Sequence, residues 1–269
     1  MARISLLLLW LLSGMLPASD LALEQRYAEQ LEAGLVQGTA QRLKAGDSEF
    51  LALHQEVDGD VAQGGAILMH GPGAHPDWLD VIHPLRVGLP KHGWETLSIQ
   101  MPLAGPGAGV EEYVDLLPEA FPRIEAALAY FKSRKIEHVV LIGHGLGARA
   151  GLLFLGEKKP PQRKAVKGLV MIGLALDKED EKSIAALKAI KLPVLDLYGS
   201  SDKEAVIASQ ELRRRMAGYA DNKGYQQSEM LGADHFFRGQ SQMLLLRIRG
   251  WLGKNLPNPK PLSYKDLKK

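Results

Sequence analysis

Apolar and polar positions follow different patterns on the two sides of Gly64. Before it, apolar residues at helical spacing over 21–35 predict an amphipathic helix, and residues 40–44 and 49–57 predict two strands joined by a turn. After it, short apolar runs alternate with amphipathic segments, which is typical of a parallel sheet with helices on both faces. We therefore predict an α/β domain, with a mostly parallel, doubly wound sheet that carries an antiparallel hairpin at its amino-terminal edge.

The same alternation predicts the elements beyond Gly64. The longest predicted helix, 111–134, contains Pro118 and Pro122, which we expect to bend or divide it because proline lacks the amide N–H. A later helix carries three consecutive arginines, 213–215, which we expect on a solvated face. Strands are predicted at 66–69, 96–99, 139–142, 168–174, 193–198 and 225–230, and helices at 78–89, 111–134, 178–190, 205–216 and 243–256.

Length and composition indicate one globular domain. The chain has 269 residues, of which 46% are hydrophobic and 24% charged, and we predict a domain over 36–256 that follows a helical segment, 20–35. The formal net charge of +2 is too small to indicate binding to nucleic acid. Cysteine is absent from the sequence, which excludes disulfides, a thiol nucleophile and thiolate metal ligands.

Both ends of the chain differ from this domain. Residues 1–19 have the features of a secretory signal: Arg3, an apolar run over 4–12, and small residues where cleavage is expected, near Ala18 or Ser19. The run is shorter than the ~20 residues of a spanning helix, so we expect no membrane span after cleavage; an uncleaved anchor is the alternative. Export without cysteine suits a bacterial periplasm. Residues 257–269, with three prolines and four lysines, predict a basic tail that is extended or disordered.

The most informative stretch is 138–147, which reads H-V-V-L-I-G-H-G-L-G. A buried-type strand runs into a glycine-spaced turn, and helix-forming residues follow at once. Strand, sharp turn and helix in this order are typical of the nucleophile elbow G-x-S-x-G, whose middle position carries the nucleophile. Here that position is Gly145, which has no side chain.

Three further motifs follow predicted strands, namely His70–Gly73, Gly199–Asp202 and Gly232–His235. Together with the elbow, their order along the chain resembles that of the α/β-hydrolase superfamily over residues 36–256. The run 70–102 is similar, more narrowly, to an uncharacterised bacterial family of exported α/β-hydrolase-like proteins. That narrower resemblance implies no known substrate.

The superfamily resemblance implies a catalytic acid at Asp202 and a catalytic histidine at His235. A carboxylate beside an imidazole fixes its tautomer and stabilises the imidazolium form, so the two can act as a dyad. The plainer alternatives are that Asp202 caps a turn or helix and that His235 is a polar loop residue.

The resemblance also implies backbone donors for an oxyanion. One is the N–H of Leu146, and the other belongs to Gly73 or Ala74, because Pro72 has none. His70 and His144 stand beside these donors and complete the candidate ligand-binding set, although His144 is also expected to pack behind the turn. No metal site is predicted, because the histidines and Asp77 match no zinc spacing.

Three functions agree with these residues. The first is a non-catalytic protein that binds a small acyl, peptide or glycan ligand, or a partner protein, in the former active-site cleft. The second is an enzyme in which the His235–Asp202 dyad activates water or abstracts a substrate proton, with backbone amides stabilising an oxyanion. The third is a hydrolase with a displaced nucleophile, for which Ser98, Ser200 and Ser201 are the nearest serines. None of these functions calls for a cofactor.

Overall fold

The structure is a computed structural model that describes residues 19–157, 161–219, 221–258 and 260–263. The predicted signal, apart from Ser19, therefore lies outside the described residues. Among the helices of the described ranges, none combines the length and the apolar character that a bilayer-crossing segment needs.

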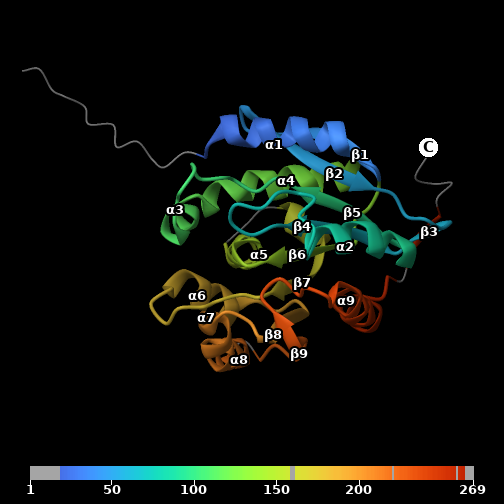
Figure 1. The fold of residues 1–269 in the computed structure, drawn as a ribbon. Coiled ribbons are helices and arrows are strands. Elements are labelled where there is room, and N and C mark those ends of the chain that lie inside the picture. The colour runs from blue at the N-terminus through green and yellow to red at the C-terminus, as the bar shows by residue number, and fades with distance from the viewer. Residues whose placement is uncertain (1–18, 158–160, 220, 259, 264–269) are drawn as a thin grey trace, which may run out of the picture.

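In the described residues, eight strands form the central sheet in the order β1-β2-β5-β4-β6-β7-β8-β9 (Figure 1). The β1–β2 and β2–β5 pairs are antiparallel, and every later pair in this order is parallel. The predicted mostly parallel sheet with an antiparallel edge hairpin is confirmed. The strands are β1 Thr39–Ala45, β2 Ser48–Gln55, β4 Gly64–Met69, β5 Trp94–Ile99, β6 Val139–His144, β7 Val166–Ile172, β8 Val194–Ser201 and β9 Tyr225–Asp234.

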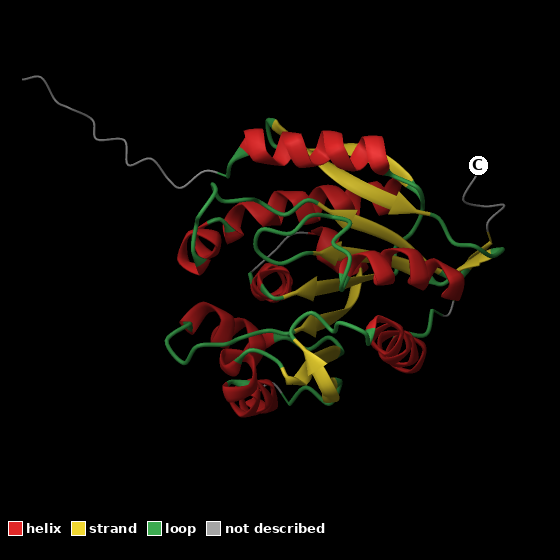
Figure 2. Cartoon of the chain, in the orientation of Figure 1, coloured by secondary structure: helices red, strands yellow, loops and turns green. Residues whose placement is uncertain are grey.

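Helices cover both faces of this sheet (Figure 2). Helices α2 and α9 pack on one face, and α4, α5, α6 and α8 pack on the other. The helices are α1 Leu21–Gly34, α2 Ile82–Gly88, α3 Val110–Asp115, α4 Leu117–Ser133, α5 Leu146–Gly156, α6 Glu181–Ala189, α7 Glu204–Ala208, α8 Gln210–Tyr219 and α9 Ser241–Asn255, with the 3₁₀ turns Leu89–His92 and Pro161–Ala165.

The position of strand β6 in the sheet explains why residues 139–142 form an unbroken apolar run. Val139 and Leu141 point into the core under α4 and α5, whereas Val140 and Ile142 point into the core under α2 and α9. A strand buried on both faces has no polar side, so its sequence does not alternate.

The long helix predicted at 111–134 is divided at Leu116. Pro118 lies in the first turn of α4, where its missing N–H costs no hydrogen bond, and Pro122 lies inside that helix. The short helix α3 before the break has no buried residue.

The prediction of a solvated arginine face is wrong for Arg213. Its side chain is fully buried, and its Nε donates to Asp196 Oδ2 on β8 at 2.8 Å. Asp196 also accepts from Tyr225 Oη at 2.6 Å and from Gln227 Nε2 at 2.9 Å. A carboxylate in the middle of a sheet strand needs such partners, and the arginine run supplies one of them.

The described part of the tail, for which an extended or disordered chain is predicted, contains a short strand. Leu262 and Ser263 form strand β10, which pairs antiparallel with the short strand β3, Val61–Ala62. Asn258 Nδ2 donates to Gln63 O at 2.7 Å. The chain therefore returns to the domain after α9, through strands too short to leave a hydrophobic pattern in the sequence.

Helix α1 is fastened to the domain by a buried ion pair. Glu24 Oε2 accepts from Arg123 Nη1 of α4 at 2.8 Å, and both side chains are almost completely buried. Glu24 Oε1 also accepts from the N–H of Leu103, at 3.0 Å. The same carboxylate thereby fixes the start of the loop that follows β5.

Candidate active site

The turn between β6 and α5 has the backbone of an elbow. Gly145 has φ +55° and ψ −119°, a conformation that only glycine adopts without strain. Its N–H donates to Ile172 O at 2.9 Å, and its carbonyl accepts from the N–H of Ala148 at 3.1 Å. The sharp turn is therefore fixed on both sides by the backbone.

The three glycines of this turn are not equivalent. A Cβ at Gly143 would lie 2.4 Å from the Gly147 backbone, and a Cβ at Gly147 would lie 2.2 Å from Met69 O, so neither position admits a side chain. A Cβ at Gly145 would meet a single neighbour within 4 Å, His235 Nε2 at 3.9 Å. Packing leaves room for a side chain at position 145, and that side chain would face an imidazole.

Asp202 and His235 lie together at the carboxyl end of the sheet. Nδ1 of His235 is 2.6 Å from Asp202 Oδ1, and the carboxylate side chain is fully buried. The amides of Lys203 and Gly199 donate to the same carboxylate, at 2.7 and 3.3 Å.

Burial alone would raise the pKa of Asp202, but the hydrogen bond and charge of His235 and the two amides outweigh it and hold the pKa below its ordinary value. The ionised carboxylate places the imidazole proton on Nδ1. Nε2 of His235 is then the nitrogen that faces position 145.

The glycine after β7 makes space for this pair. Gly173 has φ +62°, and a Cβ there would lie 3.0 Å from both Cε1 and Nδ1 of His235 and 3.5 Å from Asp202 Oδ2. Sequence reasoning missed Gly173, although a glycine at the end of a predicted strand is a signal of close approach.

His144 lies behind the histidine of the dyad. Its Nε2 is 3.0 Å from the backbone oxygen of His235, and the two ring centroids are 4.6 Å apart. Burial, together with the electrostatic effect of the neighbouring His235 imidazole, lowers the pKa of His144 to about 4. His144 is therefore neutral, donates through Nε2, and holds the His235 backbone in place.

His70, at the end of β4, has a similar supporting place. Its Nε2 accepts from the N–H of Met101 at 2.9 Å, so the proton is on Nδ1, which donates to Gly71 O at 2.8 Å. Burial lowers the pKa of His70 to about 3. Both ring nitrogens bond to backbone groups, so His70 supports the two loops, and it also lines the small cavity beside the elbow.

The backbone donors predicted for an oxyanion belong to the start of α5 and to the loop after β4, and Leu146 of this set lines a small cavity. Leu146 opens α5, so its N–H has no acceptor inside the helix. On the opposite loop, the N–H of Ala74 is used within its own turn, 3.4 Å from Gly71 O, which leaves Gly73 as the donor of the two alternatives. The cavity is lined by His70, Gly71, Pro72, Met101, Pro102, Tyr113, Leu116, Leu117, Ala120, Leu146 and Gly147.

Comparison with known proteins places this arrangement in a family. The model of the family described as "Protein of unknown function (DUF3530)" matches residues 17–111 and 116–254. The chain belongs to the DUF3530 family. No curated protein matches it.

Solved structures show the fold to which this DUF3530 protein belongs. A dienelactone hydrolase from Anabaena variabilis ATCC 29413 is 20% identical with a TM-score of 0.64, and the match covers 82% of this chain and 98% of that one. Est1E from Butyrivibrio proteoclasticus is 14% identical with a TM-score of 0.61, covering 80% and 98%. XC6422 from Xanthomonas campestris, titled a serine hydrolase without lid, is 16% identical with a TM-score of 0.60, covering 84% and 98%. The fold is that of the α/β-hydrolase superfamily.

Asp77 and Ser200, two further polar candidates of the DUF3530 protein, have local partners. Asp77 Oδ1 is 2.8 Å from His83 Nδ1 and 2.7 Å from Arg86 Nε, an ion-pair group that fastens the loop before α2. Across the described ranges, no three His, Cys, Asp or Glu side chains are grouped so that they could hold a metal ion. Ser200 Oγ accepts from the N–H of Gly232 at 2.8 Å, a turn-stabilising contact.

Proposed function

We propose that this protein binds a small ligand through a carbonyl or carboxylate oxygen at the elbow, without forming an acyl-serine intermediate. The observation that carries the proposal is the space over Gly145. The turn keeps its backbone, its two packing glycines and the facing His235, while position 145 has no side chain. A ligand oxygen fits where a nucleophile would otherwise stand.

The amino-terminal end of α5 supports an acceptor group in this space. The N–H of Leu146 is free of helical partners, and the helix dipole favours negative charge at this end. His235 faces the same space through Nε2, which can donate or accept according to the ligand. A small acyl, peptide or glycan ligand carries suitable oxygens, and no nucleic acid is involved.

Acyl-enzyme chemistry through residue 145 is disfavoured on chemical grounds. Glycine has no atom that could be acylated at its side chain. In serine hydrolases, loss of a triad member leaves only ~10³ to 10⁴-fold catalysis from binding and the oxyanion donors. The solved structures described as hydrolases or esterases are 14–20% identical to this chain, so they support a shared fold and not a shared activity.

A second function is favoured by the geometry of the dyad. The 2.6 Å contact of Nδ1 with Asp202 leaves Nε2 as a base directed at the space over Gly145. A water molecule there could give a proton to Nε2 while its oxygen attacks an ester carbonyl. When the tetrahedral adduct collapses, the leaving alkoxide takes the proton from His235, so that an acid and an alcohol are released.

Binding and turnover measurements distinguish the two functions. Purified protein is titrated with butyrate, hexanoate and N-acetyl amino acids by NMR, and tested for hydrolysis of p-nitrophenyl, thioester and amide substrates. Saturable binding without turnover supports the first function, and turnover that disappears in His235→Ala supports the second. Labelling of the wild type by a fluorophosphonate would favour a displaced serine. If the protein showed no binding and no turnover, both proposals would be contradicted.

We also propose export to the periplasm with removal of the signal. The amide nitrogen of Ser19 lies 3.2 Å from Glu119 Oε1. Cleavage after Ala18 would turn this nitrogen into an ammonium group, which the carboxylate would then neutralise. The intact mass of the protein from a periplasmic fraction tests this: a chain that begins at Ser19 is expected, and one that retains residues 1–18 would contradict it.

A further inference from the structure

Another cavity, which we call the α9 cleft, lies between α9 and the last two strands of the sheet. Its volume is about 330 Å³, and α9 supplies most of its wall, with Leu195 of β8 and Gln226 of β9. These two residues stand near the beginnings of their strands, whereas Asp202 and His235 follow the ends of the same strands. The α9 cleft is therefore at the opposite edge of the sheet from the elbow, roughly 30 Å away along β9.

Three residues of α9 give the cleft its charge and its hollow shape. Arg247, Gly250 and Lys254 are spaced by three and four residues, so they lie along one stripe of the helix. The two cationic residues are roughly 10 Å apart along the helix axis. Among the described residues, a Cβ at Gly250 would meet no atom within 4 Å outside its own stretch of helix. The centre of the stripe is therefore a gap between two cations.

The two cations of the stripe are not neutralised by carboxylates. In the part of the chain that the structure describes, neither Arg247 nor Lys254 takes part in an ion pair, and the cleft has no aspartate or glutamate in its wall. Arg247 Nη1 donates to Ser228 Oγ at 3.2 Å, which leaves its other N–H groups for a ligand. The sequence explains this excess of positive charge, because residues 235–263 contain no acidic residue but carry Arg238, Arg247, Arg249, Lys254 and Lys260.

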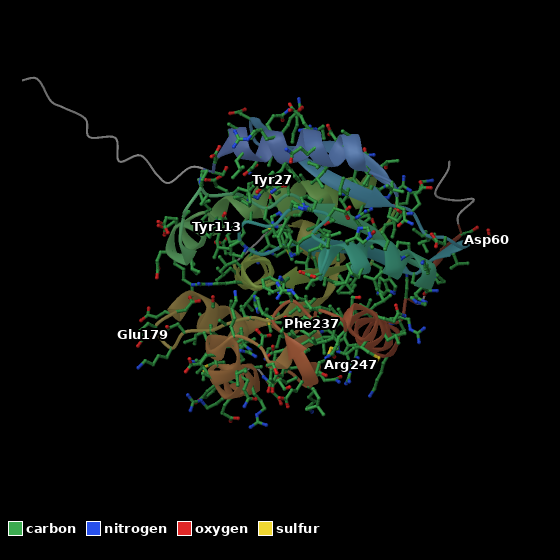
Figure 3. All side chains as sticks on the ribbon, in the orientation of Figure 1. Tyr27, Asp60, Tyr113, Glu179, Phe237 and Arg247 are labelled. Atoms are coloured by element: carbon green, nitrogen blue, oxygen red, sulfur yellow. The ribbon has the colours of Figure 1, made fainter. Side chains whose placement is uncertain are left out.

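Apolar side chains border the charged stripe on one side. Met243, which is 55% exposed, and Leu246 line the same cleft, in the turn of α9 that precedes Arg247. Figure 3 labels Arg247 beside α9 and Glu179 on the far side of this half of the molecule, near α6, so the basic cleft is remote from the acidic turn there. A ligand that complements the cleft has both an anionic group and an apolar group.

We propose that the α9 cleft binds an amphiphilic phosphate, with the phosphate group over Gly250 between Arg247 and Lys254, and an apolar chain against Met243 and Leu246. Arginine forms paired hydrogen bonds with phosphate oxygens, and lysine adds a point charge. A phosphate group has more free oxygens than a carboxylate, so it can contact both cations at once. Soluble phosphate monoesters and the headgroups of anionic phospholipids share this chemistry. The inference is independent of the proposed function, because the cleft and the elbow have no residue in common.

Hexyl phosphate tests the site in solution. It is titrated into ¹⁵N-labelled protein while the signals of the Gly250 amide and the Trp251 indole, both in the wall of the cleft, are followed by NMR. We expect saturable shifts, which 1-hexanol at the same concentrations does not produce. Arg247→Gln and Lys254→Gln should each weaken binding about fivefold, the upper end for an exposed charge pair. The matched control is Arg249→Gln, which removes the same charge from the same helix but not from the cleft, and should change binding by less than about twofold.

Filling the cleft gives a second test. Gly250→Met keeps both cations and replaces a poor helix former by a good one, so the helix should remain folded. Its side chain occupies the gap, and hexyl phosphate should bind at least about tenfold more weakly. The site would be overturned if the wild type showed no saturable binding, if Arg249→Gln lost as much affinity as Arg247→Gln, or if Gly250→Met bound undiminished.

Vesicles distinguish the two sources of the phosphate. Vesicles of phosphatidylcholine, with and without phosphatidylglycerol, are sedimented with the wild type and the same charge variants, so that contributions from other parts of the chain are equal in all samples. Binding that needs phosphatidylglycerol and falls about fivefold in Arg247→Gln but not in Arg249→Gln supports a lipid headgroup. Saturable binding of hexyl phosphate without such vesicle binding supports a soluble phosphate monoester.

Discussion

His235 Nε2 faces Gly145 at the distance expected of a base that faces a nucleophile. A Cβ at residue 145 would be 3.9 Å from this nitrogen and would meet no other neighbouring side chain within 4 Å. A hydroxyl oxygen on that Cβ could therefore reach Nε2 within about 3 Å, an ordinary hydrogen-bond length. The elbow, the dyad and the space between them are consistent with one another, although the residue at the centre is glycine.

Gly145→Ser should accordingly create a reactive serine. We expect the variant to be labelled by a fluorophosphonate and to hydrolyse p-nitrophenyl acetate at least about 100-fold faster than Gly145→Ala, since a positioned general base contributes 10² or more. Gly145→Ala is the matched control because it carries the same backbone strain at φ +55° without the hydroxyl. Mass spectrometry locates the label, and labelling should be lost in Gly145→Ser/His235→Ala. A folded, unlabelled Gly145→Ser protein would contradict the distance argument.

Gly173→Ala should disturb the dyad. Its methyl group would press on the His235 ring at 3.0 Å, so we expect the Nδ1–Asp202 hydrogen bond to lengthen and its downfield NMR proton signal to disappear. The strain of φ +62° adds a loss of stability of about 1–2 kcal/mol. Gly46→Ala is the control, because Gly46 has the same φ and no atom within 4 Å. A Gly173→Ala protein that keeps the signal would show that the pocket around His235 is adaptable.

The sequence predicted those parts of the site that lie in short continuous motifs. Gly145, Asp202 and His235 each follow a predicted strand, so the parallel sheet brings them to one edge without any knowledge of side-chain contacts. The importance of Gly173 could not be predicted in this way, because it depends on contacts with His235 and Asp202 from distant parts of the chain. His70 and His144 were placed at the site, but only the hydrogen bonds show that they support it from behind.

The main elements of the fold could also be predicted from the sequence, whereas its short pairings could not. Strands buried on both faces and amphipathic helices leave strong patterns, and these gave the sheet and its edge hairpin. Pairings such as β3 with β10 are two residues long and leave no pattern. The burial of Arg213 depends on Asp196, a charged residue inside an otherwise apolar strand, whose partner could not be chosen among three adjacent arginines.

That arginine run supplies a stability prediction. Arg213→Met leaves the buried Asp196 carboxylate without its cation, so we expect a loss of about 3 kcal/mol, the low end for a broken buried pair, because Tyr225 and Gln227 still donate to it. Arg214 is exposed and pairs with Glu211, so Arg214→Met should change stability by less than about 0.5 kcal/mol. Urea unfolding of the two variants makes the comparison. Equal stabilities would contradict the buried pair.

The buried histidines predict how stability depends on pH. The pKa of His70 is lowered to about 3 and that of His144 to about 4, from an ordinary value of 6.5. At pH values between the lowered and the ordinary pKa, the unfolded chain binds protons that the folded protein does not. The contribution of these histidines to the free energy of unfolding is therefore fully present above pH 6.5 and falls as the pH decreases. Two such groups give a slope of up to about 2.7 kcal/mol per pH unit.

Asp202 affects stability in a lower pH range, because its pKa is held below its ordinary value. Its contribution to the free energy of unfolding is present above about pH 4 and is lost as the pH falls below that value. Urea unfolding from pH 4.5 to 7.5 therefore isolates the histidines. His144→Gln keeps a donor toward the His235 carbonyl but cannot be protonated, and it should lower the slope by up to about 1.4 kcal/mol per pH unit. A slope equal to that of the wild type would mean that His144 is protonated in the folded protein, and its assignment as a neutral donor behind His235 would have to be withdrawn.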